Sequence, residues 1–235
     1  MNMKLIFREM KREAQNAYSL IFEPNTELVW NAGEYLEIKM PHKDEDNRGI
    51  ERYFSISAAP SEGVVMITTR FFDDKASSFK KALFELKTGD VLDTVKKPEN
   101  NESFFNANDS SREYIFLTAG IGITPVRSVV KEYHLTTRTL KGTLLYANRN
   151  EEYIFGEELE KMANDMHEFT IQKYHGKRIN KEVLEELLEK SHNPIFNISG
   201  TYDFNMQMKE LLLNQLNIEA SNVKSSSFGK GYSKD

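Results

Sequence analysis

The sequence predicts two domains, an antiparallel β-barrel followed by an α/β domain with a parallel sheet. The length of 235 residues suits two domains of about 100–130 residues each. Short segments rich in β-branched and aromatic residues dominate the first half, whereas apolar strands alternate with helical patterns in the second. A polar, turn-rich stretch at residues 97–112 separates these patterns. The predicted domains are therefore residues 1–108 and 109–235.

In the first domain, the expected strands are short and are separated by turn-forming residues. They cover residues 28–30, 35–40, 53–56 and 64–71. Phe79, Leu83 and Leu86 then recur at helical spacing, which predicts a short helix over residues 78–86. Such a series of short strands is typical of a small antiparallel barrel.

In the second domain, strands alternate with helices, which predicts βαβ units and a Rossmann-like parallel sheet with helices on both faces. The expected strands cover residues 114–118, 142–147, 169–172 and 195–199. A helical pattern follows each strand, and Asn180 is expected to cap the helix that follows the third.

The composition excludes several kinds of chemistry. The sequence has no cysteine, so disulfides, thiolate zinc sites, cysteine nucleophiles and cysteine-ligated iron–sulfur clusters are excluded. The five histidines lack metal-ligand spacing, and no metal site is expected. If the protein handles electrons, an organic cofactor must hold them. A net charge of −5 argues against general nucleic-acid binding, which needs a basic surface.

No targeting or membrane segment is expected. The sequence has no run of eighteen apolar residues, so we expect no membrane-spanning helix. The first residues soon become charged and form no apolar signal segment, so a cytoplasmic location is expected.

A glycine-rich turn follows the first strand of the second domain. In Gly120-Ile121-Gly122-Ile123-Thr124-Pro125, the glycines would let backbone N–H groups approach a pyrophosphate. Thr124 is expected to cap the following helix, and Pro125 suits its first position. A plain tight turn is the alternative, because the usual third glycine is absent.

Two further segments of the barrel are suited to phosphate. In Arg52-Tyr53-Phe54-Ser55, an arginine fork and an aromatic ring share one face of a strand. Ser77 and Ser78 open the short helix, where free N–H groups and hydroxyls can meet a phosphate. Taken singly, these segments also fit a barrel strand with a surface arginine and an ordinary serine cap.

Together, these segments resemble the ferredoxin–NADP reductase superfamily over nearly the whole chain, in their order and spacing. The similar segments are Gly33-Glu34-Tyr35-Leu36, Arg52-Tyr53-Phe54-Ser55, Ser77-Ser78-Phe79-Lys80 with the later Gly89-Asp90, Gly120 to Pro125, Tyr146-Ala147-Asn148-Arg149 and Ser199-Gly200-Thr201.

The resemblance implies an FAD-binding barrel and an NAD(P)H-binding α/β domain. Arg52 would bind the FAD pyrophosphate, Phe54 would pack on the flavin, and Ser55 would lie near its N5 atom. The other residues expected at FAD are Tyr53, Thr69, Arg70, Ser77 and Ser78. Those expected at NAD(P)H are Gly120, Gly122, Thr124, Pro125, Arg149 and Gly200. The residues expected to act in the hydride step are Ser55, Ser199 and Phe228.

The chain departs from the pattern of this family at several positions. Phe54 replaces a tyrosine, Ser199 replaces a cysteine, and Ser226 stands where an acidic residue is expected. Phe228 is the candidate for the aromatic side chain that covers the flavin until nicotinamide displaces it. A disordered tail is the alternative for that segment.

Three functions fit the sequence. The first is an FAD-dependent reductase that takes hydride from NADH or NADPH and passes electrons to a separate acceptor. In the second, that acceptor is a ferredoxin, a flavodoxin or an oxygenase component, and any iron–sulfur cluster lies on another polypeptide. The third is a regulatory or scaffold module that keeps the fold without hydride transfer. Arg149 and Lys173 can hold a 2′-phosphate, but the choice between NADH and NADPH stays open.

Overall fold

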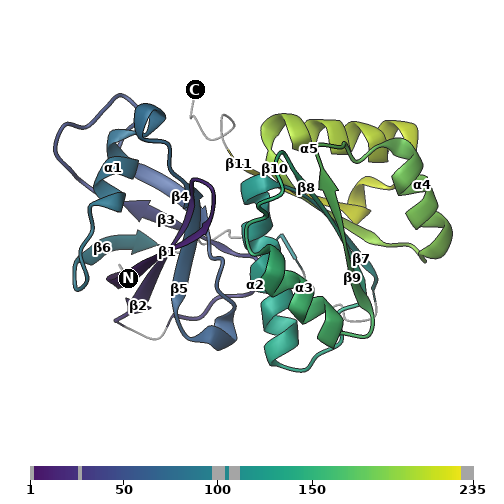
Figure 1. Ribbon diagram of the computed structural model, residues 1–235, viewed down its shortest axis with the longest axis horizontal. Helices are drawn as coiled ribbons and strands as arrows, with labels where there is room; N and C mark the ends of the chain where they lie inside the picture. Colours follow the sequence, from purple (N-terminus) through teal and green to yellow (C-terminus); the bar gives the residue numbers. More distant parts are fainter. Residues whose placement is uncertain (1–2, 26–27, 97–103, 106–111, 229–235) are drawn as a thin grey trace.

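The computed structural model describes residues 3–25, 28–96, 104–105 and 112–228, which form two domains lying side by side (Figure 1). The predicted boundary between residues 108 and 109 lies outside the described residues. Helix α2 of the second domain lies next to the barrel (Figure 1).

The first domain is a barrel of six antiparallel strands in the order β4-β3-β6-β1-β2-β5. The strands are β1 (Met3–Ala14), β2 (Ala17–Pro24), β3 (Tyr35–Lys39), β4 (Glu51–Ser55), β5 (Val65–Arg70) and β6 (Val91–Lys96). An antiparallel bridge between Ile56 and Ile67 joins the two outer strands of this order. The N–H of Ser57 donates to the carbonyl of Met66 at 2.7 Å beside it. These contacts complete the barrel that the sequence predicts.

The first two strands were not expected from the sequence. In β1, buried Leu5 and Phe7 alternate with exposed Lys4 and Arg8, so its composition looks too polar for a strand. Pairing with β2 through a tight turn makes it one, because strand formation depends more on cross-strand partners than on intrinsic propensity. Conversely, the expected strand at residues 28–30 is wrong, because the structure forms no strand there.

The second domain has a five-stranded sheet in the order β11-β10-β7-β8-β9, with every neighbouring pair parallel. The strands are β7 (Tyr114–Ala119), β8 (Gly142–Asn148), β9 (Phe169–His175), β10 (Ile195–Thr201) and β11 (Val223–Phe228). The barrel domain contains helix α1 (Ser78–Phe84). The second domain contains α2 (Ile123–Leu135), α3 (Gly156–Asp165), α4 (Lys181–Lys190) and α5 (Tyr202–Lys209). Strand β11 was not predicted, because its Lys-Ser-Ser-Ser sequence has little apolar character.

Both faces of the parallel sheet are covered, as predicted. On one face, Phe116 packs in a core that includes Val126 of α2 and Leu159 of α3. On the other face, Ile198 packs with Leu184 of α4 and Met208 of α5. Asn180 caps α4 as expected, because its side chain accepts a hydrogen bond from the N–H of Val183.

Strand order reverses between β7 and β10. The chain runs from β7 outward to β8 and β9, and then returns to the other side of β7 to form β10 and β11. In open parallel sheets, ligands bind in the crevice at the carboxyl ends of the strands where this reversal occurs. The ends of β7 and β10 are therefore the place to look for a site.

Two features are absent from the part of the chain that the structure describes. None of its helices is long and apolar enough to cross a membrane. It holds no group of three or more histidine, aspartate or glutamate side chains suited to a metal ion.

Phe105, just before the second domain, is packed into the core of that domain. Its side chain is 2% exposed, and its ring centroid lies 4.6 Å from that of Tyr114 and 5.6 Å from that of Tyr133. This ring therefore ties the connection between the domains to the α2 face of the sheet.

We expect Phe105→Ala to lower the free energy of unfolding by about 3–5 kcal/mol, because it removes a buried ring and leaves a cavity. Chemical denaturation measures this loss. Phe72→Ala is the matched control, since Phe72 is 43% exposed and should change stability little. Equal losses in the two variants would contradict the assignment.

Candidate functional site

The glycine turn after β7 packs against the backbone of β10. A Cβ atom on Gly122 would lie 2.1 Å from the carbonyl oxygen of Ser199, and one on Gly200 would lie 2.6 Å from the ring of Phe204. Gly120 adopts the left-handed conformation, with φ of +54°. Glycine is therefore required sterically at two of these positions and conformationally at the third. The turn lies at the carboxyl ends of β7 and β10, where the strand order reverses.

The predicted roles of Thr124 and Pro125 in starting α2 need correction. The helix begins at Ile123 with Gly122 as its N-cap, so Thr124 occupies the second position and Pro125 the third. The hydroxyl of Thr124 donates to the carbonyl of Ile121 at 3.1 Å instead of capping the helix. Pro125 still lies in the first turn, where a missing N–H removes no helical hydrogen bond.

A row of hydroxyl side chains crosses the sheet beside the glycine turn. Thr118, Ser199 and Ser226 are register partners on β7, β10 and β11, so their side chains point to the same face. Thr118 and Ser199 are fully buried, and neither hydroxyl has a hydrogen-bond partner among the described residues. Buried polar groups without partners are uncommon in native structures, and they mark this edge as a place that suits a polar ligand.

The N-terminus of α1 is held by internal hydrogen bonds. Ser77 caps the helix, with its hydroxyl accepting from the N–H of Lys80 at 3.2 Å. The N–H of Ser78 donates to Asp46 Oδ2 at 2.9 Å, and the hydroxyl of Ser78 accepts from the N–H of Asp46 at 2.9 Å. The ring of His42 contacts the same hydroxyl at 2.8 Å. A carboxylate of the chain itself thus lies where the sequence predicts a phosphate.

Cations outnumber carboxylates around this helix. Arg48 pairs with Asp46 at 2.6 Å, while the guanidinium of Arg52 lies 5.2 Å from the ring centroid of Phe79 and donates to the carbonyl of Arg48 at 2.8 Å. The half-buried Lys80 donates to the carbonyl of Arg70 at 2.8 Å.

The pKa shifts follow from this crowding of charge. The hydrogen bond from Arg48, and then that from the N–H of Ser78, hold the pKa of Asp46 well below its usual range. Burial, and then the charges of Arg52 and Arg48, lower the pKa of Lys80. Among the described contacts of Arg48, Arg52 and Lys80, only that of Arg48 is with the Asp46 carboxylate, so this cationic cluster favours a further anion.

The remaining predicted FAD residues line the same part of the barrel. Phe54 is 8% exposed and stacks with Phe79 of α1, with ring centroids 6.2 Å apart. Ser55 and Thr69 are buried, whereas Tyr53 is 40% exposed and meets Tyr35 edge-on. The predicted pair Arg52 and Phe54 is therefore brought to α1, while Tyr53 lies on the outer face.

Arg70 connects the barrel to the glycine turn. Its carbonyl accepts from Lys80 of the cationic cluster, and its Nη2 atom lies 3.6 Å from where a Cβ of Gly120 would be. The hydroxyl of Tyr146 donates to the carbonyl of Gly120 at 3.2 Å on the other side of the turn. Arg70 thus contacts both predicted phosphate sites, with its backbone at the cationic cluster and its side chain at the glycine turn.

Other predicted residues lie apart from these contacts or outside the description. Arg149 follows β8 and is exposed. Lys173 pairs with Glu160 at 2.6 Å and lies over the ring of Tyr153. The backbone of Phe228, at the end of β11, pairs with Thr201 of β10. The side chain of Phe228 lies outside the described parts, so its role of covering the flavin stays a prediction.

Sequence reasoning missed Asp46, Arg48 and Lys80. Asp46 and Arg48 reach α1 from a loop that carries no motif, whereas Lys80 lies within the Ser77-Ser78-Phe79-Lys80 segment but was assigned no role. The spacing of Asp46 and Arg48, two residues apart before a predicted flavin strand, was the available signal.

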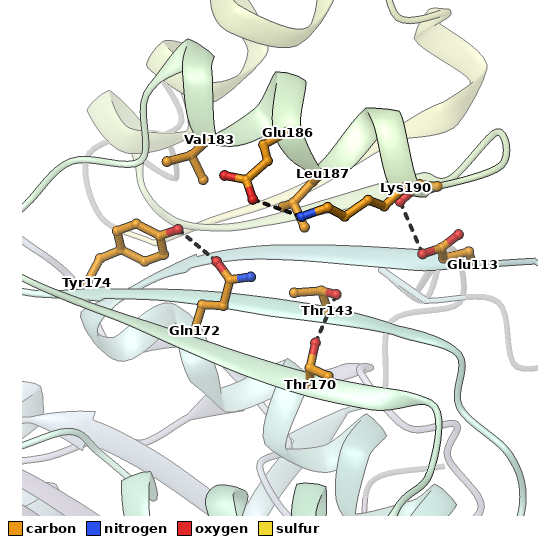
Figure 2. Close-up of a pocket in the computed structure, with 10 residues that line it drawn as sticks. Glu113, Thr143, Thr170, Gln172, Tyr174, Val183, Glu186, Leu187 and Lys190 are labelled. Carbon is orange, nitrogen blue, oxygen red and sulfur yellow. Dashed lines mark hydrogen bonds and ion pairs between the residues drawn. The ribbon is translucent and has the colours of Figure 1, made fainter.

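A hollow of about 240 Å³ lies elsewhere, between α4 and strands β8 and β9 (Figure 2). Its polar side chains bond to one another in pairs: Glu186 with Lys190, Tyr174 with Gln172, Thr143 with Thr170, and Glu113 with Ser191. Thr143 and Thr170 are the second residues of their strands, so the hollow is not at the carboxyl edge of the sheet. We therefore exclude it from the candidate site.

We expect Gly122→Ala to lower the free energy of unfolding by about 3 kcal/mol or more, because its Cβ would overlap the backbone of β10. Gly120→Ala is the control for backbone strain and should cost only about 1–2 kcal/mol, since its Cβ would meet nothing closer than 3.6 Å. Chemical denaturation compares the two, and a smaller loss at Gly122 would contradict the close packing.

Asp46→Asn should destabilise the protein in a pH-dependent manner. The pKa of Asp46 is lower in the folded protein than in the unfolded chain. The ionised carboxylate therefore stabilises the folded state fully at pH values above its ordinary pKa of 3.8, and this stabilisation is lost as the pH falls through the folded-state pKa. The gap in melting temperature between wild type and variant should therefore be widest above about pH 5 and shrink below about pH 4. Asp73→Asn, in an exposed turn, controls for the loss of one charge. A gap that stays constant from pH 3 to 7 would refute the coupling.

Comparison with known proteins agrees with this geometry. Residues 116–208 match the model of the oxidoreductase NAD-binding domain. The phthalate 4,5-dioxygenase oxygenase reductase subunit of Pseudomonas putida is 32% identical over 127 residues, 53% of this chain and 35% of that protein. A flavohemoprotein of Bacillus subtilis (strain 168) is 22% identical over 231 residues, 88% of this chain and 54% of that protein. The chain thus spans little more than a third of the first relative and about half of the second.

Solved structures share the whole architecture. The FAD/NAD-binding domain of nitric oxide dioxygenase from Vibrio cholerae superposes with a TM-score of 0.79 at 18% identity, covering 97% of this chain and 99% of that one. Ferredoxin–NADP⁺ reductase from Plasmodium falciparum superposes with a TM-score of 0.73 at 16% identity, covering 96% and 95%. The chain therefore has the two-domain fold of these structures, and its second half is similar to the oxidoreductase NAD-binding domain.

Proposed function

We propose that the chain is an FAD-dependent oxidoreductase that accepts hydride from NADH or NADPH and passes the electrons to a separate acceptor. The observation that carries the proposal is that Arg70 contacts both predicted binding sites. The cationic cluster of the barrel lies on one side of this residue, and the glycine turn at the strand-order reversal lies on the other. A flavin and a nicotinamide nucleotide bound at these sites would lie next to each other.

The barrel residues fit FAD because they offer positive charge beside an aromatic face. Arg52 and Lys80 would bind the pyrophosphate, which would compete with Asp46 for the N–H of Ser78. Phe54 would pack against the flavin, and Ser55 would lie within hydrogen-bonding reach of N5. Bound FAD would supply the conversion from a two-electron donor to one-electron steps.

The α/β domain fits a nicotinamide nucleotide. The Gly120–Gly122 turn and the first N–H groups of α2 would receive the pyrophosphate, since helix N-termini favour anions. The unpartnered hydroxyl of Ser199 would contact the nicotinamide, and Gly200 would leave room for its ribose. These residues would orient the nicotinamide toward the flavin, and a hydride, two electrons with one proton, would pass between them over a separation of about 3–3.5 Å.

The acceptor is a redox group outside the described chain. The similarity to a reductase subunit of a dioxygenase favours an oxygenase component, and a ferredoxin, a flavodoxin or a small diffusible molecule is the alternative. The exposed Arg149 would contact a 2′-phosphate if NADPH is the donor. A cytoplasmic location stays a prediction from the sequence.

Anaerobic reduction tests the proposal. The purified protein should be yellow, or become yellow with added FAD, and its flavin absorbance should bleach with NADH or NADPH. Comparing the two bleaching rates identifies the donor. A colourless protein that does not bind FAD would refute the proposal and favour a scaffold role, while a yellow protein that neither nucleotide bleaches would refute the hydride step.

Arg52→Met should weaken FAD binding by about 10- to 100-fold, as expected for loss of a charge-assisted hydrogen bond. Quenching of flavin fluorescence on titration measures the dissociation constant. Arg8→Met is the matched control, because Arg8 lies elsewhere on the barrel and pairs with Glu23. Unchanged FAD affinity in Arg52→Met would contradict the assigned role of Arg52.

A further inference from the structure

Arg127 of α2 joins the two domains through every hydrogen-bond donor of its guanidinium. Its five hydrogen bonds reach Glu62 and the carbonyl of Ser57 in the barrel, and Glu158 of α3 in the second domain. Both carboxylates are bound by two nitrogens, in the fork geometry that suits arginine. The side chain is only 6% exposed, and its guanidinium lies 5.2 Å from the ring centroid of Phe155.

This charge is buried but fully compensated. Burial alone would lower the pKa of Arg127, but the hydrogen bonds that it donates to Glu62 and Glu158 outweigh burial, and the net pKa is raised. Burial would likewise raise the pKa of Glu158, but the hydrogen bond and charge of Arg127 lower it. Removal of one partner would leave buried charge without compensation, so the three side chains act as a unit.

Other residues of α2 contact the same barrel segment. The hydroxyl of Ser128 donates to the carbonyl of Ala58 at 2.6 Å, and Glu132 accepts from both the N–H and the hydroxyl of Ser61 at 2.8 Å. One face of α2 is therefore held against residues 57–62. Only Arg127 among these three also binds another element of the α/β domain.

The two elements joined by Arg127 continue directly into the two halves of the proposed site. Ser57 comes two residues after Ser55, which is expected near flavin N5. Arg127 comes three residues after Thr124, at the end of the glycine turn. A displacement of α2 relative to segment 57–62 would therefore change the separation between flavin and nicotinamide without altering either binding site.

We infer that Arg127 is a positioning residue, which sets the distance and angle between the flavin strand and the nucleotide turn. This inference rests on the proposed function for its kinetic consequence, but its structural part concerns the orientation of the two domains. Hydride transfer is sensitive to such placement, since a shift of about 1 Å far from the reacting atoms can cost about 100-fold in rate.

The kinetic test compares Arg127→Lys and Arg127→Met with Lys131→Met. Lys131 lies on α2, as Arg127 does, and pairs with Glu158 of α3. It has no described bond to the barrel, so it is the matched control. At saturating NADH or NADPH, flavin bleaching in both Arg127 variants should slow by about 10- to 100-fold. The dissociation constants of FAD and the nucleotide should change less than about threefold. The isotope effect from deuterium at nicotinamide C4 should rise, because transfer becomes rate-limiting.

A distance measurement reads the orientation directly. Because the sequence has no cysteine, Val91→Cys in the barrel and Leu135→Cys at the end of α2 give a single pair of labelling sites, 49% and 44% exposed. Pulsed electron resonance between two spin labels should show one narrow distance distribution in the parent protein and in Lys131→Met. The distribution should broaden or shift in both Arg127 variants.

The outcomes separate the two claims. Wild-type bleaching rates and an unchanged distance distribution in folded Arg127→Lys would overturn the inference and leave Arg127 a stabilising residue only. If the parent protein is not bleached by either nucleotide, the proposed function fails, while the distance measurement still decides whether Arg127 sets the domain orientation. If Arg127→Met does not fold, Arg127→Lys decides both.

Discussion

The packing of the Gly122 turn against β10 is the constraint on which the rest of the site depends. It brings the backbone of the turn to a separation that no side chain would permit, and so sets where α2 starts. From that start, α2 lies against the barrel and places Arg127 in contact with the segment that follows β4. The position of the nucleotide turn and the orientation of the barrel are thus linked through one rigid helix.

Charge organises the barrel side of the interface. Three cations and one carboxylate surround α1, and the carboxylate of Asp46 takes the N–H group that a phosphate would otherwise accept from. The domain interface shows the opposite arrangement, since Arg127 binds two carboxylates and is fully compensated. The first cluster has an excess of two positive charges and is suited to an anionic ligand. The second is saturated and is suited to holding two domains together.

Local pattern accounts for much of the fold. Helical spacing in α1 and the alternation of strands and helices after residue 112 predicted their elements correctly, because burial of one face imposes a period. The strands β1, β2, β6 and β11 escaped prediction. Of these, β1 and β11 are polar segments that become strands only by pairing with neighbours, whereas β2 is largely apolar. The cap of α2 was also wrong, since a short turn of helix at Gly120–Gly122 moves its start toward the N-terminus.

The sequence by itself determined the order of the domains and the glycine turn, because such features are local and depend on spacing along the chain. It also predicted Arg52, Phe54 and Ser199 as site residues. It also excluded a cysteine-ligated cluster by composition. Only the tertiary structure decided that Asp46 and Lys80 join Arg52, and that Arg127 contacts the barrel. These contacts join residues far apart in sequence, and their partners are chosen by how strands and helices pack rather than by any local pattern.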